Sequence, residues 1–175
     1  IGCVEIVNRF LTGRTFHQYI NPERTMPPEA FAIHGLSDGF LKDKPKFAEV
    51  AADFLEFIQG AELLIHNAEF DRGFLDNELG LLGRPLLDQV CSGIIDTLKL
   101  ARDLRPGRKN SLDALCKEFD IDNSSRQLHG ALVLTVVALA CAEPLRVLRL
   151  LLMPLGAGLC IVPMVYGIGG VHLVL

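Results

Sequence analysis

The stretch AELLIHNAEFDRGFLDNELGLL, residues 61–82, decides the fold class of this chain. Its first five residues form a short apolar run, which predicts a buried strand, and residues 71–82 follow a helical pattern. Between the two lie His66, Asn67, Glu69 and Asp71, whose side chains can bind protons, metals or phosphates. A strand that runs into a helix in this way indicates an α/β fold, in which ligands bind beyond the strand ends.

The sequence on either side extends this pattern. Residues 3–10 and 15–20 are strand candidates, and the sequence LTGR between them, residues 11–14, predicts a hairpin turn. Residues 45–60 predict a helix with an apolar face, preceded by Pro45 and ended by Gly60. Alternating elements are then expected: a strand at 92–96 and helices at 97–104 and 111–119. Strands followed by strand–helix alternation predict a mixed sheet flanked by helices.

Composition restricts the class of protein. The 175 residues, half of them hydrophobic, suffice for a globular core. The formal net charge of −4 argues against a protein that coats nucleic acid by bulk charge, but not against an enzyme that holds one nucleic-acid end through metal ions. The five cysteines form no C-x-x-C pair and indicate buried thiols in a reducing cytoplasm, so a cytoplasmic protein is expected.

Each polar group taken singly also has an ordinary structural explanation. Asn67 is the expected N-cap of the helix that follows it, and Asp71 would favour the positive end of the same helix. A lone histidine such as His34 or His129 is more often a satisfied surface or core residue than a catalyst. The basic cluster, defined as Lys99, Arg102, Arg105, Arg108 and Lys109, is typical of a solvated face, although near a strand end it could receive a phosphate backbone. Asp96 is expected to cap the helix at 97–104, and Ser111 or Asn110 the helix at 111–119.

Taken together and in order, residues 29–50, 63–79 and 96–132 resemble the DnaQ-like DEDD family of 3′–5′ proofreading exonucleases, histidine subtype, the family of bacterial DNA polymerase III epsilon subunits. The resemblance covers residues 1 to about 132. It implies a ribonuclease-H-like fold and hydrolysis of mismatched 3′-terminal nucleotides. It also implies four carboxylates that hold two Mg²⁺ or Mn²⁺ ions, which stabilise the attacking and leaving oxygens, with a histidine that activates the water.

The resemblance assigns expected roles to individual residues. Asp71 would be a metal-site carboxylate, Asn67 a supporting polar group and His129 the general base. Glu29 and His34 would receive the 3′-terminal nucleotide, and Ile33 would pack on its base. The expected partners are the 3′ end of DNA, the polymerase III alpha subunit, a theta-like subunit and the sliding clamp.

The sequence departs from the family pattern at the other three carboxylates. The Asp-x-Glu motif of the first strand is expected before residue 1, and Glu5 does not replace it because VEIV matches the second strand. Leu134 stands five residues after His129, where the family has an aspartate. We therefore expect impaired metal binding and little exonuclease activity in this chain. The alternative is a non-catalytic module that binds DNA ends or a polymerase subunit.

The chain divides, on this interpretation, into an exonuclease domain at 1–131 without its first strand and an apolar tail at 132–175. Residues 150–175 carry no formal charge. A frameshift or junction product, a genuine apolar tail and a membrane span each account for this, and we favour the first. A span is disfavoured by Pro154, Pro163 and several glycines. Without a first strand, residues 3–10 would leave an unpaired sheet edge unless the tail covers it.

Overall fold

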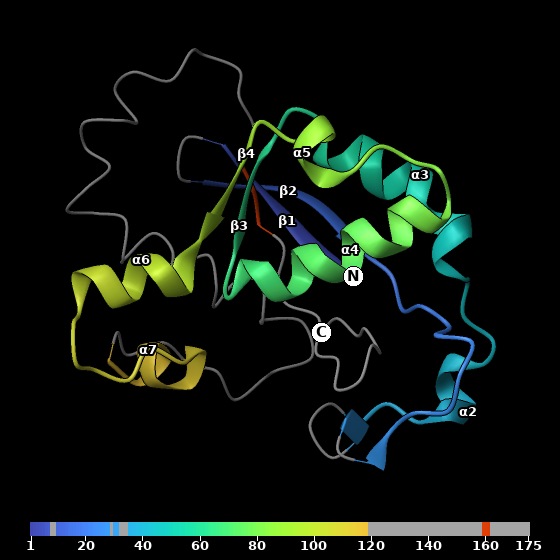
Figure 1. Cartoon of the computed structure of the whole chain (residues 1–175), viewed down its shortest axis with the longest axis horizontal. Coiled ribbons are helices and arrows are strands. Elements are labelled where there is room, and N and C mark those ends of the chain that lie inside the picture. Colours follow the sequence, from blue (N-terminus) through green and yellow to red (C-terminus); the bar gives the residue numbers. More distant parts are fainter. Residues whose placement is uncertain (8–9, 29, 32–34, 119–158, 162–175) are drawn as a thin grey trace.

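A mixed five-stranded sheet organises the part of the chain that the computed structural model describes, which is residues 1–7, 10–28, 30–31, 35–118 and 159–161 (Figure 1). The strand order is β2-β1-β5-β3-β4, with β1 at Gly2–Val7, β2 at Phe10–His17, β3 at Glu62–Ile65, β4 at Gly93–Asp96 and β5 at Leu159–Ile161. β1 is antiparallel to both β2 and β5, whereas β3 is parallel to both β4 and β5. The predicted mixed α/β sheet is confirmed.

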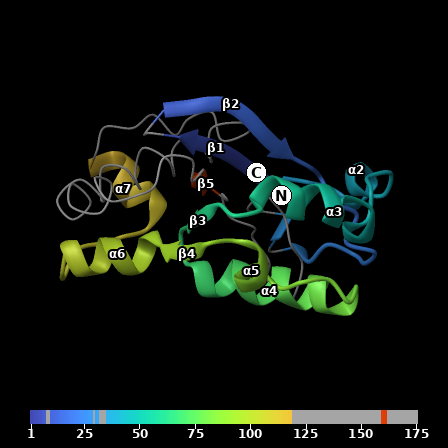
Figure 2. The same ribbon diagram turned by 90° about the horizontal axis from the view of Figure 1, so that it is seen from above.

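The longer helices occupy the predicted parts of the sequence. They are α2 (Asp38–Leu41), α3 (Phe47–Ile58), α4 (Ala68–Leu81), α5 (Leu87–Val90), α6 (Thr97–Leu104) and α7 (Leu112–Glu118). The short helices α2 and α5 were not expected from the pattern. α6 and α7 lie next to one another in both views, at the end of the sheet where β4 leads into α6 (Figure 1 and Figure 2). No helix among the described residues is long and apolar enough to cross a membrane.

Alternation along β3 divides the core between the two faces of the sheet. Leu63 and Ile65 are fully buried in one cluster that includes Phe54 of α3 and Leu79 of α4. Leu64 belongs to a second cluster, with Ile6 of β1 and the partly buried Leu112 of α7. Because successive strand residues point to opposite faces, this one short strand is covered by helices on both sides. That burial explains why Leu63, Leu64 and Ile65 are all apolar.

The predicted hairpin turn at residues 11–14 is wrong. These residues lie within β2, where the register changes from Val4 opposite Thr15 to Ile6 opposite Leu11. Gly13 has a φ of +86°, which glycine adopts without steric cost, so it accommodates extra residues as a bulge inside the strand. The turn sequence therefore bends the strand and does not end it.

β5 lies beside β1, at the edge that was expected to be unpaired. Val4 pairs with Ile161 on one side of β5, and Leu63 pairs with Cys160 on the other. A three-residue segment from the apolar tail thus joins β1 to β3, two strands that are more than fifty residues apart in the sequence. The predicted domain boundary at residue 131 lies outside the described residues and stays a prediction.

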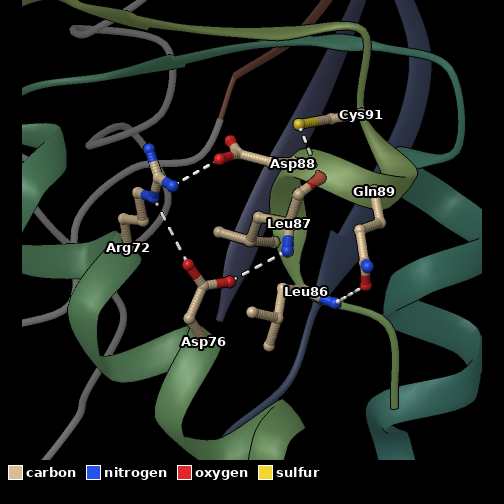
Figure 3. A network of polar contacts seen from close by, with 7 residues as sticks. All are labelled: Arg72, Asp76, Leu86, Leu87, Asp88, Gln89 and Cys91. Carbon is tan, nitrogen blue, oxygen red and sulfur yellow. Dashed lines mark hydrogen bonds and ion pairs between the residues drawn. The ribbon is translucent and has the colours of Figure 1, made fainter.

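A polar network fixes α5 against α4 (Figure 3). The Asp76 carboxylate accepts a hydrogen bond from the backbone N–H of Leu87 at 2.9 Å, and its other oxygen lies 3.3 Å from Nε of Arg72. The Arg72 guanidinium also pairs with the exposed Asp88. Asp76 therefore satisfies a backbone donor at the start of α5, a group that the helix itself leaves without a partner.

Candidate functional site

The carboxyl ends of β3 and β4 meet and bring two short polar segments together. Ile65 pairs with Asp96 in the parallel register, so the residues that follow each of them are neighbours. His66 Nδ1 lies 3.1 Å from Thr97 Oγ1. Both side chains are buried, with 5% of His66 and 0% of Thr97 exposed. The structure thus places the polar residues after β3 where an α/β fold binds its ligands.

Asp96 links the two strand ends. Its Oδ1 accepts hydrogen bonds from the backbone N–H groups of Leu98 at 2.8 Å and Lys99 at 3.2 Å, which confirms its predicted N-cap role for α6. The same oxygen accepts the backbone N–H of Asn67 at 3.2 Å. One carboxylate therefore caps α6 and holds the first turn of the β3–α4 connection.

Asn67 occupies the predicted N-cap position of α4, but its side chain makes no capping hydrogen bond, so that part of the prediction is wrong. Its backbone is left-handed, with φ 68° and ψ 51°. An N-cap that accepts bonds from the first turn is normally extended, and asparagine is one of the few residues that tolerate the left-handed region. The exposed side chain of Asn67 is consequently not engaged by its own helix.

The environment of His66 favours the neutral imidazole. Burial lowers its pKa from the ordinary value of 6.5, and the positive charge of Arg102 lowers the pKa further. The charge of Asp96 and a hydrogen bond with the backbone of Asn110 act in the opposite direction, but burial is the largest effect. Hydrogen bonds with Thr97 and with the backbone of Asn110 fix the orientation of the imidazole, which carries no charge in its neutral form.

An open cavity of about 450 Å³ lies against this junction, between the end of β3, α6 and the loop before α7. The polar residues along its described lining are His66, Asn67, Arg102, Arg108, Asn110 and Ser111.

Asn110 and Ser111 form hydrogen bonds that stabilise the loop along one side of this cavity. The Asn110 side chain donates to the carbonyl of Arg108 at 3.0 Å and accepts from Nη1 of Arg105 at 3.1 Å. The Ser111 hydroxyl accepts the backbone N–H of Ala114 at 3.4 Å, so Ser111 and not Asn110 makes the predicted cap of α7.

Asp71 lies in the first turn of α4, as predicted, and is completely buried. It is not part of the described cavity lining. Among the residues that the structure describes, no group of three or more His, Cys, Asp or Glu side chains could hold a metal ion. The described residues therefore do not fit the two-ion site that the resemblance implies.

The remaining predicted site residues, Glu29, Ile33, His34 and His129, lie outside the described residues, as does Leu134. Of the predicted set, the structure places Asn67 and Asp71 in one helix turn. Thr97 was not predicted from the sequence, although a hydroxyl residue directly after a strand-ending aspartate was the available signal. The bond from Asn67 to Asp96 was not predictable either, because the two residues are 29 positions apart.

Comparison with known proteins identifies the family of this chain. A family model described as exonuclease matches residues 1–133. The DNA polymerase III epsilon subunits of Salmonella typhimurium (strain LT2) and Escherichia coli (strain K12) are each 56% identical over 135 residues, which cover 76% of this chain and 55% of theirs. The Rickettsia felis epsilon subunit is 59% identical over 133 residues, covering 75% of this chain and 58% of its own.

The chain thus spans a little more than half the length of these relatives. A solved structure of exonuclease X, in complex with 5′ overhanging duplex DNA, shares the fold with a TM-score of 0.61 and 24% identity, and the match covers 81% of this chain and 80% of that one. The resemblance first drawn from the motifs is confirmed, and so is the ribonuclease-H-like fold. The chain belongs to the exonuclease family.

Proposed function

We propose that this chain is the exonuclease domain of an epsilon-type proofreading subunit, which removes mismatched 3′-terminal nucleotides from DNA by phosphodiester hydrolysis. The observation that carries the proposal is the 56–59% identity, over 133–135 residues, to proteins named DNA polymerase III subunit epsilon. The substrate on this proposal is a single-stranded or frayed 3′ end.

The proposed roles of the residues follow the family motifs. His129 takes the proton of the attacking water, and Glu29, Ile33 and His34 receive the terminal nucleotide. Asp71 is a carboxylate of the metal site, and Asn67 supports it. The position of Asn67 and Asp71 at the end of β3 supports these two assignments, because that is where an α/β sheet binds ligands.

The exonuclease family depends on divalent metal ions, and we propose Mg²⁺ or Mn²⁺ for this site. These ions need several hard oxygen ligands. The sequence supplies Asp71 but has leucine at position 134. We therefore propose that the 175-residue chain by itself binds DNA ends and hydrolyses them poorly, which is the behaviour of a binding module.

One experiment tests both parts. The chain, its Asp71→Ala variant and a restored chain are incubated with a 5′-fluorescein-labelled primer that carries a mismatched 3′ end, in Mg²⁺ or Mn²⁺. The restored chain combines Leu134→Asp with an added N-terminal strand that bears the family's Asp-x-Glu motif. The expected result is binding without shortening for the chain as given, and shortening from the 3′ end for the restored chain.

In the restored chain, Asp71→Ala should abolish cleavage, and His129→Ala should slow it by roughly 10²–10⁴-fold, the usual effect of losing a general base. A restored chain that folds but neither binds nor shortens the primer would overturn the exonuclease proposal. If the chain as given shortens the primer in an Asp71-dependent way, the proposal of weak hydrolysis is wrong.

Partner binding is a separate proposal. We propose three partners, the polymerase III alpha subunit, a theta-like subunit and the sliding clamp, because the relatives are named as subunits of DNA polymerase III. Co-elution of the chain with each purified protein in size-exclusion chromatography tests it, and elution as separate peaks contradicts it for that partner.

A further inference from the structure

The cavity beside His66 is lined by side chains that offer hydrogen-bond donors. Arg102 and Arg108 contribute guanidinium groups, Asn67 an amide and Ser111 a hydroxyl. No carboxylate belongs to the described lining. A cavity with two cationic groups, neutral donors and no described acid is complementary to an anion with several oxygen atoms.

Among the described residues that line this cavity, Arg102 has the guanidinium group most available to bind a ligand. It is exposed on α6 and forms no hydrogen bond or ion pair with any residue that the structure describes. Arg108, by contrast, pairs with Glu118 at 2.7 Å, and Arg105 pairs with the same carboxylate. Glu118 therefore neutralises only part of the charge in this loop, and Arg102 keeps its full charge.

The wall of the cavity is fixed before any ligand arrives. His66 is held by Thr97, and Asn110 is held by Arg105 and the backbone of Arg108. The charge of Arg102 is felt at the His66 ring, where it lowers the pKa of the imidazole. The charge of Asp96 raises the same pKa, and the neutral histidine adds no charge of its own to the cavity lining.

We propose that this cavity is a subsite for one internucleotide phosphate of the DNA strand, bound by Arg102 together with the Asn67 amide and the Arg108 guanidinium. The subsite rests on the proposed function for its choice of ligand. Its volume admits a phosphate with part of a sugar, and a guanidinium matches two phosphate oxygens at once. Asp71 is not in the described lining, so this phosphate is a positioning contact and not the group that is hydrolysed.

The first test measures the affinity of the 175-residue chain for 5′-fluorescein-labelled dT10 by fluorescence anisotropy, in EDTA so that the DNA stays intact. Arg102→Gln should weaken binding about tenfold or more and make the slope of log K against log salt about 0.7 less negative, the value for one phosphate contact on a single strand. The matched control is Arg84→Gln. Arg84 is also exposed but lies after the far end of α4 and outside the cavity. It should change affinity by less than about twofold.

The second test locates the phosphate. Single methylphosphonate linkages, which are neutral, replace the phosphates of dT10 one at a time from the 3′ end. At one position the substitution should weaken binding to the wild-type chain but not weaken binding to Arg102→Gln any further, because both changes remove the same contact. Additive losses at every position would overturn the subsite and would mean that Arg102 acts only through long-range charge.

The outcomes also separate this inference from the proposed function. If the wild-type chain, folded by circular dichroism, does not bind dT10, the proposed function fails and the subsite with it. If the wild-type chain binds and Arg102→Gln binds equally well with an unchanged melting temperature, the subsite is wrong and the proposed function stands.

Discussion

Replacing Asp96 with alanine should destabilise the protein measurably, because one oxygen of this side chain satisfies three backbone donors. Oδ1 of Asp96 accepts the N–H groups of Leu98, Lys99 and Asn67 at 2.8, 3.2 and 3.2 Å. The first two belong to the first turn of α6, and the third belongs to the connection between β3 and α4. The substitution therefore weakens a helix start and the junction of two strands at once.

The expected magnitude follows from these contacts. Loss of an N-cap costs about 0.5–2 kcal/mol, with about 1 kcal/mol typical. The bond to Asn67 is exposed, so water partly replaces it, and its loss should cost about 0.5–1.5 kcal/mol. Together, Asp96→Ala should lower the free energy of unfolding by about 1–3.5 kcal/mol. Asp96→Asn keeps an oxygen at the same place and should cost less than about 1 kcal/mol, because asparagine caps as well as aspartate.

Urea unfolding followed by circular dichroism measures this difference, and hydrogen exchange of the Asn67 amide tests its cause. Asp103→Ala is the matched control, since Asp103 is exposed on the same helix and should change stability by no more than about 0.5 kcal/mol. The reasoning is refuted if Asp96→Ala unfolds within about 0.5 kcal/mol of the wild type, or if the exchange rate of the Asn67 amide does not rise.

Three further predictions concern the pH dependence, the α4–α5 contact and the sheet. Because burial lowers the pKa of His66 below 6.5, the unfolded chain binds this proton more readily, and the free energy of unfolding should fall as the pH drops below 6.5. His66→Gln should make that fall shallower in urea titrations, and an unchanged slope would contradict the assignment. Asp76→Ala should lower the free energy of unfolding by about 1–3 kcal/mol, since it leaves the backbone N–H of Leu87 without a partner. Asp88→Ala should lower it by no more than about 1 kcal/mol, because the pair of Asp88 with Arg72 is exposed. Equal losses in the two variants would show that the ion pair and not the backbone bond matters. Cys160→Pro should increase hydrogen exchange in both β1 and β3, because proline cannot donate to a central strand, and Cys160→Val should not. Unchanged exchange in the proline variant would mean that β5 contributes little to the sheet.

The sequence determined the elements whose signals are local. The strand predicted at 61–65 is observed at Glu62–Ile65, the helix at Phe47–Ile58 ends near Gly60, and Asp96 caps the helix that follows it, as predicted. Each of these depends on side-chain periodicity or on bonds within three or four residues, which a single sequence displays directly. The exonuclease motifs were recognisable for a related reason, since their spacing along the chain is itself the signal.

Only the tertiary structure decided the contacts between distant segments. LTGR carries the composition of a turn, yet pairing with β1 makes it a bulge in β2. Asparagine is a common capping residue, but the backbone of Asn67 is left-handed and its N–H donates to the carboxylate of Asp96. In this conformation the Asn67 side chain does not cap the helix. The donor-lined cavity forms because parallel pairing sets the end of β3 beside the start of α6. Strand pairing and the formation of a cavity depend on groups that are tens of residues apart in the sequence. Local propensity does not predict which of these groups will be in contact.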